Sequence, residues 1–166
     1  MKLSHTKLIV LSGLIWFAIG VYLLQLGLGL LLGTLHAGAD VPTPLIHTLS
    51  PWIVTAQTAV LGLILLGLFI GYFKGRYVLG KSAKRGVSRI LSFPSPVPLS
   101  KIYSLKYYLL LGLMVGLGVS IKFLGIHNDI RGFIDVAIGA ALINGAAIYF
   151  QCAQTAKAQV RTSDDK

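Results

Sequence analysis

The stretch KGRYVLGKSAKRGVSRILSFPSPVPLSKIYSLK, residues 74–106, decides how this chain is organised. It holds eight of the fifteen Lys and Arg residues and no acidic residue. Apolar segments long enough to cross a bilayer lie on both sides of it, two before and two after. Because loops rich in Lys and Arg resist translocation, this basic bridge predicts which way the protein faces. It also divides the chain into two helical hairpins.

The composition indicates a membrane protein. The chain has 166 residues, of which 55% are hydrophobic and 12% charged, against about 25% charged in a soluble domain. Glutamate is absent. The net charge of +10 fits cytoplasmic loops that favour anionic headgroups, and the sequence contains no module that predicts nucleic-acid binding. The single cysteine, Cys152, excludes an internal disulfide and a C-x-x-C redox pair.

We expect an all-α, polytopic fold with four transmembrane helices in a single membrane domain. About 20 apolar residues cross a bilayer, and the segments that satisfy this length are 8–33, 52–73, 107–126 and 133–151. The first is far longer than the core of about 7–15 residues in a cleaved signal peptide, so we expect it to be retained. Residues 152–166 are polar and are expected to form a mobile tail.

The distribution of basic residues predicts the orientation. The N-terminus, the basic bridge and the tail hold thirteen Lys and Arg residues, whereas the outer side holds Arg131 and, at a helix end, Lys122. The positive-inside rule therefore places both termini and the bridge in the cytoplasm. We expect a multi-pass protein of a bacterial inner membrane.

The first part of the bridge has the pattern of a basic amphipathic helix. At 100° per residue, Lys74, Lys81, Arg85 and Arg89 fall on one side, and Ala83 and other apolar residues fall opposite. Arg76 alone interrupts this pattern. Such helices lie on the inner membrane surface, and the alternate prolines of 94–98 predict a stiff extended connector after it. The residues expected to bind anionic lipid, or an acidic cytoplasmic partner, are Lys74, Lys81, Lys84, Arg85 and Arg89.

Small residues at four-residue spacing predict close helix packing. Such spacing lets two backbones approach closely in a membrane. The predicted packing glycines are Gly67, Gly71, Gly75, Gly112, Gly116 and Gly145, the last of them grouped with Ala137 and Ala141 on one face. These faces would close the bundle within one chain, or join copies in a homo-oligomer or a larger membrane complex.

Four polar residues within or beside the spans are candidates for function. Asp135 is the only acid inside a predicted span, and it would pair with Arg131, four residues earlier, or with Lys122. A proton or cation site at Asp135 is the functional alternative. Asn144 is expected to make a hydrogen bond between helices, or to line a transport path together with Asp135.

The remaining polar residues do not predict a metal site, a cofactor or catalysis. His36, His47 and His127, with Asp40 and Asp129, are expected in outer loops and lack close ligand spacing. Phosphate-loop, H-E-x-x-H and G-x-S-x-G motifs are absent from the sequence. We therefore expect a protein that is not an enzyme.

Two segments, GYFKGRYVLGKSAKRGVSRI (71–90) with the prolines after it and DIRGFIDVAIGAALINGAAIYF (129–150), carry a family resemblance. They resemble small four-span bacterial inner-membrane proteins of uncharacterised function. The resemblance implies a bacterial origin and no particular activity. We therefore expect a structural, assembly or interaction role in the membrane, with a small oligomeric transporter or channel as the alternative.

Overall fold

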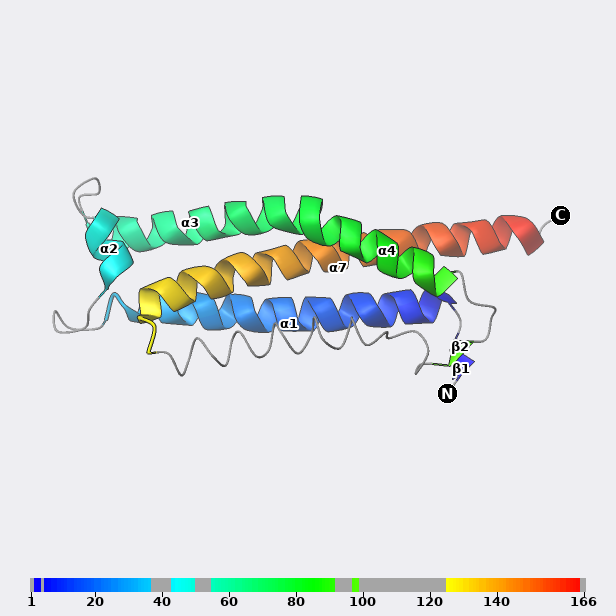
Figure 1. Ribbon diagram of the computed structural model, residues 1–166, viewed down its shortest axis with the longest axis horizontal. Coiled ribbons are helices and arrows are strands. Elements are labelled where there is room, and N and C mark those ends of the chain that lie inside the picture. The colour runs from blue at the N-terminus through cyan, green and yellow to red at the C-terminus, as the bar shows by residue number, and fades with distance from the viewer. Residues whose placement is uncertain are drawn as a thin grey trace.

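The chain forms a bundle of long helices lying lengthwise beside one another (Figure 1). The computed structural model describes residues 2–3, 5–36, 43–49, 55–91, 97–98 and 125–164. The helices are α1 (His5–Gly33), α2 (Pro44–Leu49), α3 (Ala56–Lys74), the π-helical turn η1 (Gly75–Leu79), α4 (Gly80–Leu91) and α7 (Asn128–Asp164). Two short strands, β1 (Lys2–Leu3) and β2 (Val97–Pro98), pair antiparallel.

Among the described residues, three stretches of helix are long and apolar enough to cross a membrane: Thr6–Gly33, Ala56–Ser88 and Asn128–Thr155. They are those of a helical, membrane-embedded protein, and they overlap the first, second and fourth predicted spans, although the second continues past its predicted end at 73 to Ser88. The third predicted span, 107–126, lies almost entirely outside the described residues, and so do Gly112, Gly116 and Lys122. Helix α7 continues to Asp164, through most of the segment expected to form a mobile tail.

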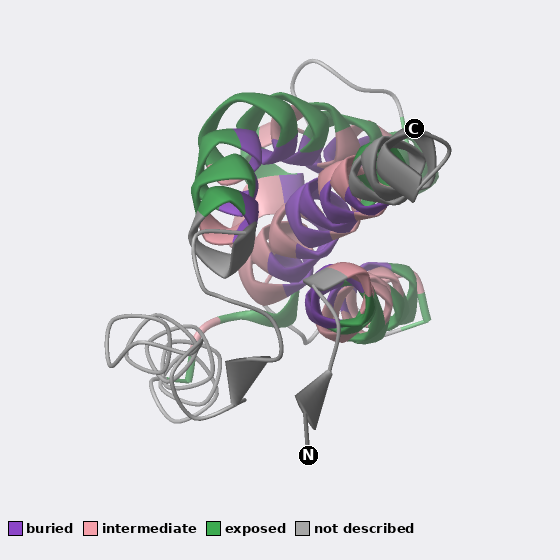
Figure 2. Ribbon diagram, turned by 90° about the vertical axis from the view of Figure 1, so that its right-hand side faces the viewer, coloured by how far each residue is buried: buried purple, intermediate pink, exposed green. Residues whose placement is uncertain are grey.

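Helix α7 lies between α1 on one side and α3 with α4 on the other. Contacts at the glycines give the directions: Gly27 of α1 meets Gly132, whereas Gly13 meets Phe150, so α1 is antiparallel to α7. Gly67 meets Val136 and Gly75 meets Asn144, so α3 runs parallel to α7. Figure 2 shows buried residues turned toward the space shared by these helices and exposed residues facing outward.

A regular seam joins α1 to α7, which share the largest interface in the bundle. Gly13, Gly20 and Gly27 recur every seven residues on α1, close to two helical turns. Gly132 and Gly139 have the same spacing on α7. A Cβ on Gly27 would lie 2.7 Å from the Gly132 carbonyl oxygen. The seam therefore brings the two backbones into contact, as small residues do in membrane helices.

Two apolar clusters fill the bundle, one near each end. The cluster near the start of α1 contains Leu8, Ile9, Trp16, Ala83, Val87, Leu142, Ala146, Tyr149 and Ala153. The cluster near α2 contains Leu31, Ile46, Ala59, Val60, Leu63 and Val136. Large apolar side chains such as Leu65 (67% exposed) and Phe69 (61% exposed) face outward from α3. An outer surface this apolar suits lipid.

Candidate functional site

Helix α4 presents its basic side outward and packs its apolar side against the protein. Ala83 is fully buried and Val87 is nearly so, in one cluster with Leu8 of α1 and Tyr149 of α7. Gly86 permits this approach, because a Cβ there would lie 2.8 Å from the Tyr149 hydroxyl. This packing corrects the expectation that the apolar side rests on lipid: another part of the chain covers it.

The π-helical turn η1 joins α3 to α4 where they lie against α7. The N–H of Gly80 donates to the carbonyl of Gly75, five residues earlier. In an α-helix each N–H donates to the carbonyl four residues earlier. A Cβ on Gly75 would lie 2.7 Å from the Ala141 carbonyl oxygen, and one on Gly80 2.7 Å from Ile148 Cδ1. The wider turn shifts the helical phase of α4 relative to α3. Such turns occur frequently at functional sites.

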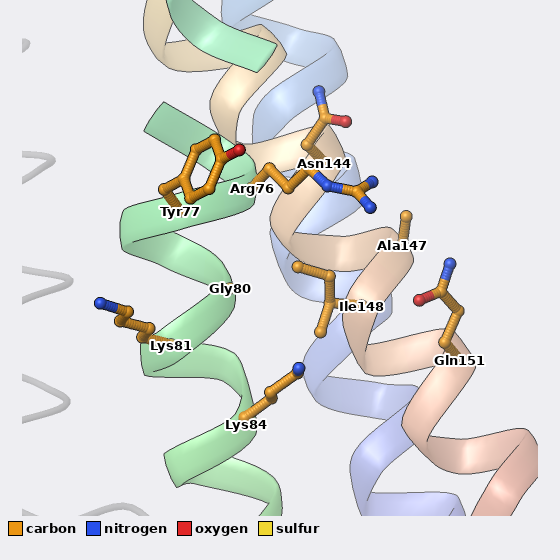
Figure 3. Close-up of a pocket in the computed structure, with 9 residues that line it drawn as sticks. All are labelled: Arg76, Tyr77, Gly80, Lys81, Lys84, Asn144, Ala147, Ile148 and Gln151. Carbon is orange, nitrogen blue, oxygen red and sulfur yellow. The ribbon is translucent and has the colours of Figure 1, made fainter. Parts of the chain in front are cut away.

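An open pocket of about 450 Å³ lies between this segment and α7 (Figure 3). Arg76 and Lys84 extend toward α7 in this view, whereas Lys81 points away from it. Within the described part of the chain, no carboxylate pairs with any of these three cations. The lining residues are Arg76, Tyr77, Gly80, Lys81, Lys84, Asn144, Ala147, Ile148 and Gln151.

The pocket divides the predicted basic residues into two groups. Lys81 and Lys84 line it, whereas Lys74 and Arg85 are exposed and are not among its lining residues. Arg89 lies in α4, and its side chain is outside the described part. Arg76 joins the pocket although it interrupted the predicted stripe, because that projection assumed a uniform helix across η1.

Asp135 and Asn144 do not share a site. Asp135 is buried; its Oδ2 lies 3.8 Å from Arg131 Nε and makes no hydrogen bond. Asn144 lines the pocket, and its Nδ2 donates to the Ala140 carbonyl at 2.9 Å. Nine residues of α-helix turn through about 900°, so the two side chains leave α7 on nearly opposite sides. The arrangement favours the Arg131 pairing over a shared path.

Asp129 has a role that the sequence did not reveal. It is fully buried, and its Oδ2 accepts hydrogen bonds from the backbone N–H groups of Leu45 (2.7 Å) and Ile46 (3.4 Å). Its Oδ1 accepts from the N–H of Ile130 at 2.8 Å. A carboxylate in this position caps the first turn of α2. Asp129 therefore fastens α2 to the beginning of α7.

The histidines lie apart from the pocket. His36 Nδ1 is 3.3 Å from the Leu32 carbonyl oxygen, and His47 lies in the last turn of α2. His127 is exposed just before α7. Asp40 lies outside the described residues. Among the residues that are described, no three His, Cys, Asp or Glu side chains are grouped so that they could hold a metal ion.

Comparisons of the chain with protein-family models, with curated proteins and with solved structures find no match. The resemblance to small four-span bacterial membrane proteins therefore stays a prediction. The functional interpretation rests on the geometry of the bundle and of the pocket.

Proposed function

We propose that this is a four-span protein of a bacterial inner membrane with a non-catalytic structural, assembly or interaction role. Both termini and the basic bridge would lie in the cytoplasm. The directions of the described helices support this topology, because α3 and α7 are parallel and α1 is antiparallel to both. Two parallel helices separated in sequence require the chain between them to return along the bundle.

The length of that return supports a fourth span. Helix α4 meets α7 at Tyr149, whereas the beginning of α7 meets α1 near Gly132. These positions are 17 residues apart, which corresponds to about 25 Å of helix. Residues 92–124 have to cover this distance, and they include most of the apolar segment 107–126. A helix there would complete two hairpins.

The observation that carries the interaction role is the fixed position of α4. Its apolar side is anchored in the bundle by Ala83 and Val87, while Arg85 of α4 and Lys74, the last residue of α3, remain exposed. A cationic surface held in one geometry favours an acidic partner and suppresses wrong ones. We therefore propose that this exposed basic face docks an acidic cytoplasmic segment of a larger membrane complex.

A pull-down in mild detergent with mass spectrometry tests this role. We expect Lys74→Gln/Arg85→Gln to lose partners that the wild type retains. The matched control is Lys157→Gln/Arg161→Gln, which removes the same charge from the C-terminal part of α7. Docking at this face would be overturned if the partners still bind Lys74→Gln/Arg85→Gln. It would also be overturned if the control variant loses them to the same extent.

A further inference from the structure

We propose that the pocket between η1–α4 and α7 binds the phosphate group of an anionic membrane lipid. This inference deepens the proposed function and rests on its topology, in which the pocket lies at the cytoplasmic boundary of the membrane. Basic pockets between transmembrane helices on that side bind anionic headgroups. Some of the pocket residues belong to the basic bridge, and the others belong to α7, which forms the opposite wall.

The lining provides hydrogen-bond donors and positive charge for phosphate oxygens. Arg76 and Lys84 extend two cations toward α7 from one wall, and Asn144 and Gln151 contribute side-chain amides from the other; Lys81 lines the same wall but points its ammonium group away. Guanidinium groups form paired hydrogen bonds to phosphate, and ammonium groups act as point charges. Asn144 uses Nδ2 to donate to Ala140, and this NH₂ group has a second hydrogen to donate.

An aromatic row beside the pocket favours a lipid over a free phosphate. Tyr77 lines the pocket, and its ring stacks on Phe73 with centroids 5.9 Å apart. Phe73 in turn lies 4.7 Å from Phe69, further along α3. All three rings are exposed. An acyl chain could lie along this row while its phosphate occupies the pocket, whereas a free phosphate would leave the row unused.

Packing within the bundle holds the two walls in place. Gly75 and Gly80 bring one wall against α7. A Cβ added to Gly75 would lie 2.8 Å from Asn144 Cβ, and a Cβ added to Gly80 would lie 2.7 Å from Ile148 Cδ1. Ala83, directly before Lys84, is fully buried. The cations therefore project from a backbone that is already fixed, which lowers the entropy lost when a ligand binds. This distinguishes the pocket from a basic surface that attracts headgroups without a defined site.

Native mass spectrometry of the delipidated full-length protein tests the inference. The probes are phosphatidylglycerol and phosphatidylcholine with identical acyl chains, and we expect the wild type to prefer phosphatidylglycerol. Arg76→Gln/Lys84→Gln removes the two cations that face α7 and with them their charge-assisted hydrogen bonds to the phosphate, so it should weaken phosphatidylglycerol binding roughly 30-fold. The control Lys74→Gln/Arg85→Gln removes equal charge outside the pocket and should bind as the wild type does.

A steric variant separates a site from general charge attraction. Ala147 is exposed and lines the pocket, so Ala147→Trp should fill it while keeping every cation and the fold. We expect this variant to lose the preference for phosphatidylglycerol. Unchanged binding by Ala147→Trp, or equal losses in the two charge pairs, would overturn the site. Inorganic phosphate that binds as tightly as the lipid would overturn the lipid assignment.

The outcomes also separate this inference from the proposed docking role. Docking of a protein partner depends on Lys74 and Arg85, whereas lipid binding depends on Arg76 and Lys84. Loss of partners with intact lipid selectivity in Lys74→Gln/Arg85→Gln would uphold the docking face, and it is also the result that the pocket proposal expects of this control. Lipid selectivity that is insensitive to the second pair overturns the pocket and leaves the docking face untouched.

Discussion

Gly20 of α1 and Gly139 of α7 face each other at the middle of the bundle, and each occupies the space where the other would carry a side chain. A Cβ on Gly20 would lie 3.0 Å from the Gly139 carbonyl oxygen, and a Cβ on Gly139 would lie 2.8 Å from the Gly20 carbonyl oxygen. Both obstacles are backbone atoms, which cannot rotate away. The close approach of α1 and α7 therefore requires glycine at both positions.

We expect Gly20→Leu to destabilise the bundle by about 1–3 kcal/mol, because it forces two backbones apart. Gly29→Leu on the same helix is the matched control, since a Cβ at Gly29 meets nothing within 4 Å. Thermal unfolding in detergent, monitored by size-exclusion chromatography, measures the difference in stability between the two variants. Equal stability of the two variants would contradict the α1–α7 seam.

Asp129→Ala should release α2 from the beginning of α7. The substitution leaves the N–H groups of Leu45 and Ile46 without their acceptor, at a cost of about 1 kcal/mol for a lost cap. Hydrogen exchange at those two amides should accelerate, while Asp129→Asn, which keeps one carbonyl acceptor, should have a smaller effect. Protection that does not change in Asp129→Ala would show that α2 is held by other contacts.

Substitutions at Arg131 and Asp135 should be strongly non-additive. Arg131→Gln leaves the buried Asp135 carboxylate without its partner and should cost about 1–3 kcal/mol. Adding Asp135→Asn removes that charge and should restore most of the loss. A double-mutant cycle measured by thermal unfolding tests this coupling. Additive losses would indicate that Asp135 has a different partner.

Asp135→Asn by itself separates the structural pair from the transport alternative. Because Asp135 Oδ2 makes no hydrogen bond, we expect the variant to insert and accumulate as the wild type does. A proton-dependent flux in vesicles, present in the wild type and absent in this variant, would contradict the structural assignment. It would also revive a role for Asp135 in a transport path.

Ala83→Leu distinguishes packing on protein from packing on lipid. Ala83 is fully buried in the cluster that holds Trp16 and Tyr149, so a larger side chain should overpack it at a cost of about 1–3 kcal/mol. A lipid-facing position would instead tolerate leucine. Ser82→Leu, one residue away and exposed, is the control. Faster hydrogen exchange in α4 of Ala83→Leu alone is the expected result.

Cysteine labelling tests the orientation. In a Cys152→Ser background, His127→Cys should react with a membrane-impermeant maleimide added to intact cells, because we expect the beginning of α7 to lie outside. Ser88→Cys should react only after the membrane is opened. Both positions are exposed in the bundle, so burial would not explain protection. The reverse pattern would overturn the predicted topology.

Hydropathy predicts much of this fold because a membrane helix needs a fixed length of apolar sequence. The predicted span 8–33 and the observed α1 end at the same residue, Gly33. The four-residue spacing of Gly67, Gly71 and Gly75 indicated a packing face, and all three glycines lie against α7. The glycines of α1 also form a repeat in the sequence, but their spacing is seven residues, so a pattern of four-residue spacing does not include them.

Other features depend on contacts that sequence patterns do not specify. An amphipathic helix has an apolar side, but the pattern does not say whether lipid or protein covers it, and α4 is covered by α1 and α7. Gly145, which was grouped with Ala137, lies between Trp16 of α1 and Leu79 of η1. Asp129 meets amide groups 83 and 84 positions away. Two residues of the pocket, Arg76 and Tyr77, lie in the π-helical turn, and a uniform helical projection of the sequence does not include such a turn.

The seam between α1 and α7 has a consequence for biogenesis. Helix α1 leaves the ribosome before α7, and about 95 residues separate them. At a synthesis rate of roughly 5–20 residues per second, α1 waits several seconds before its main packing partner exists. During that interval its glycine face meets lipid, insertion machinery or a neighbouring chain. Closure of the seam between α1 and α7 is therefore a late step, which follows the translation of α7.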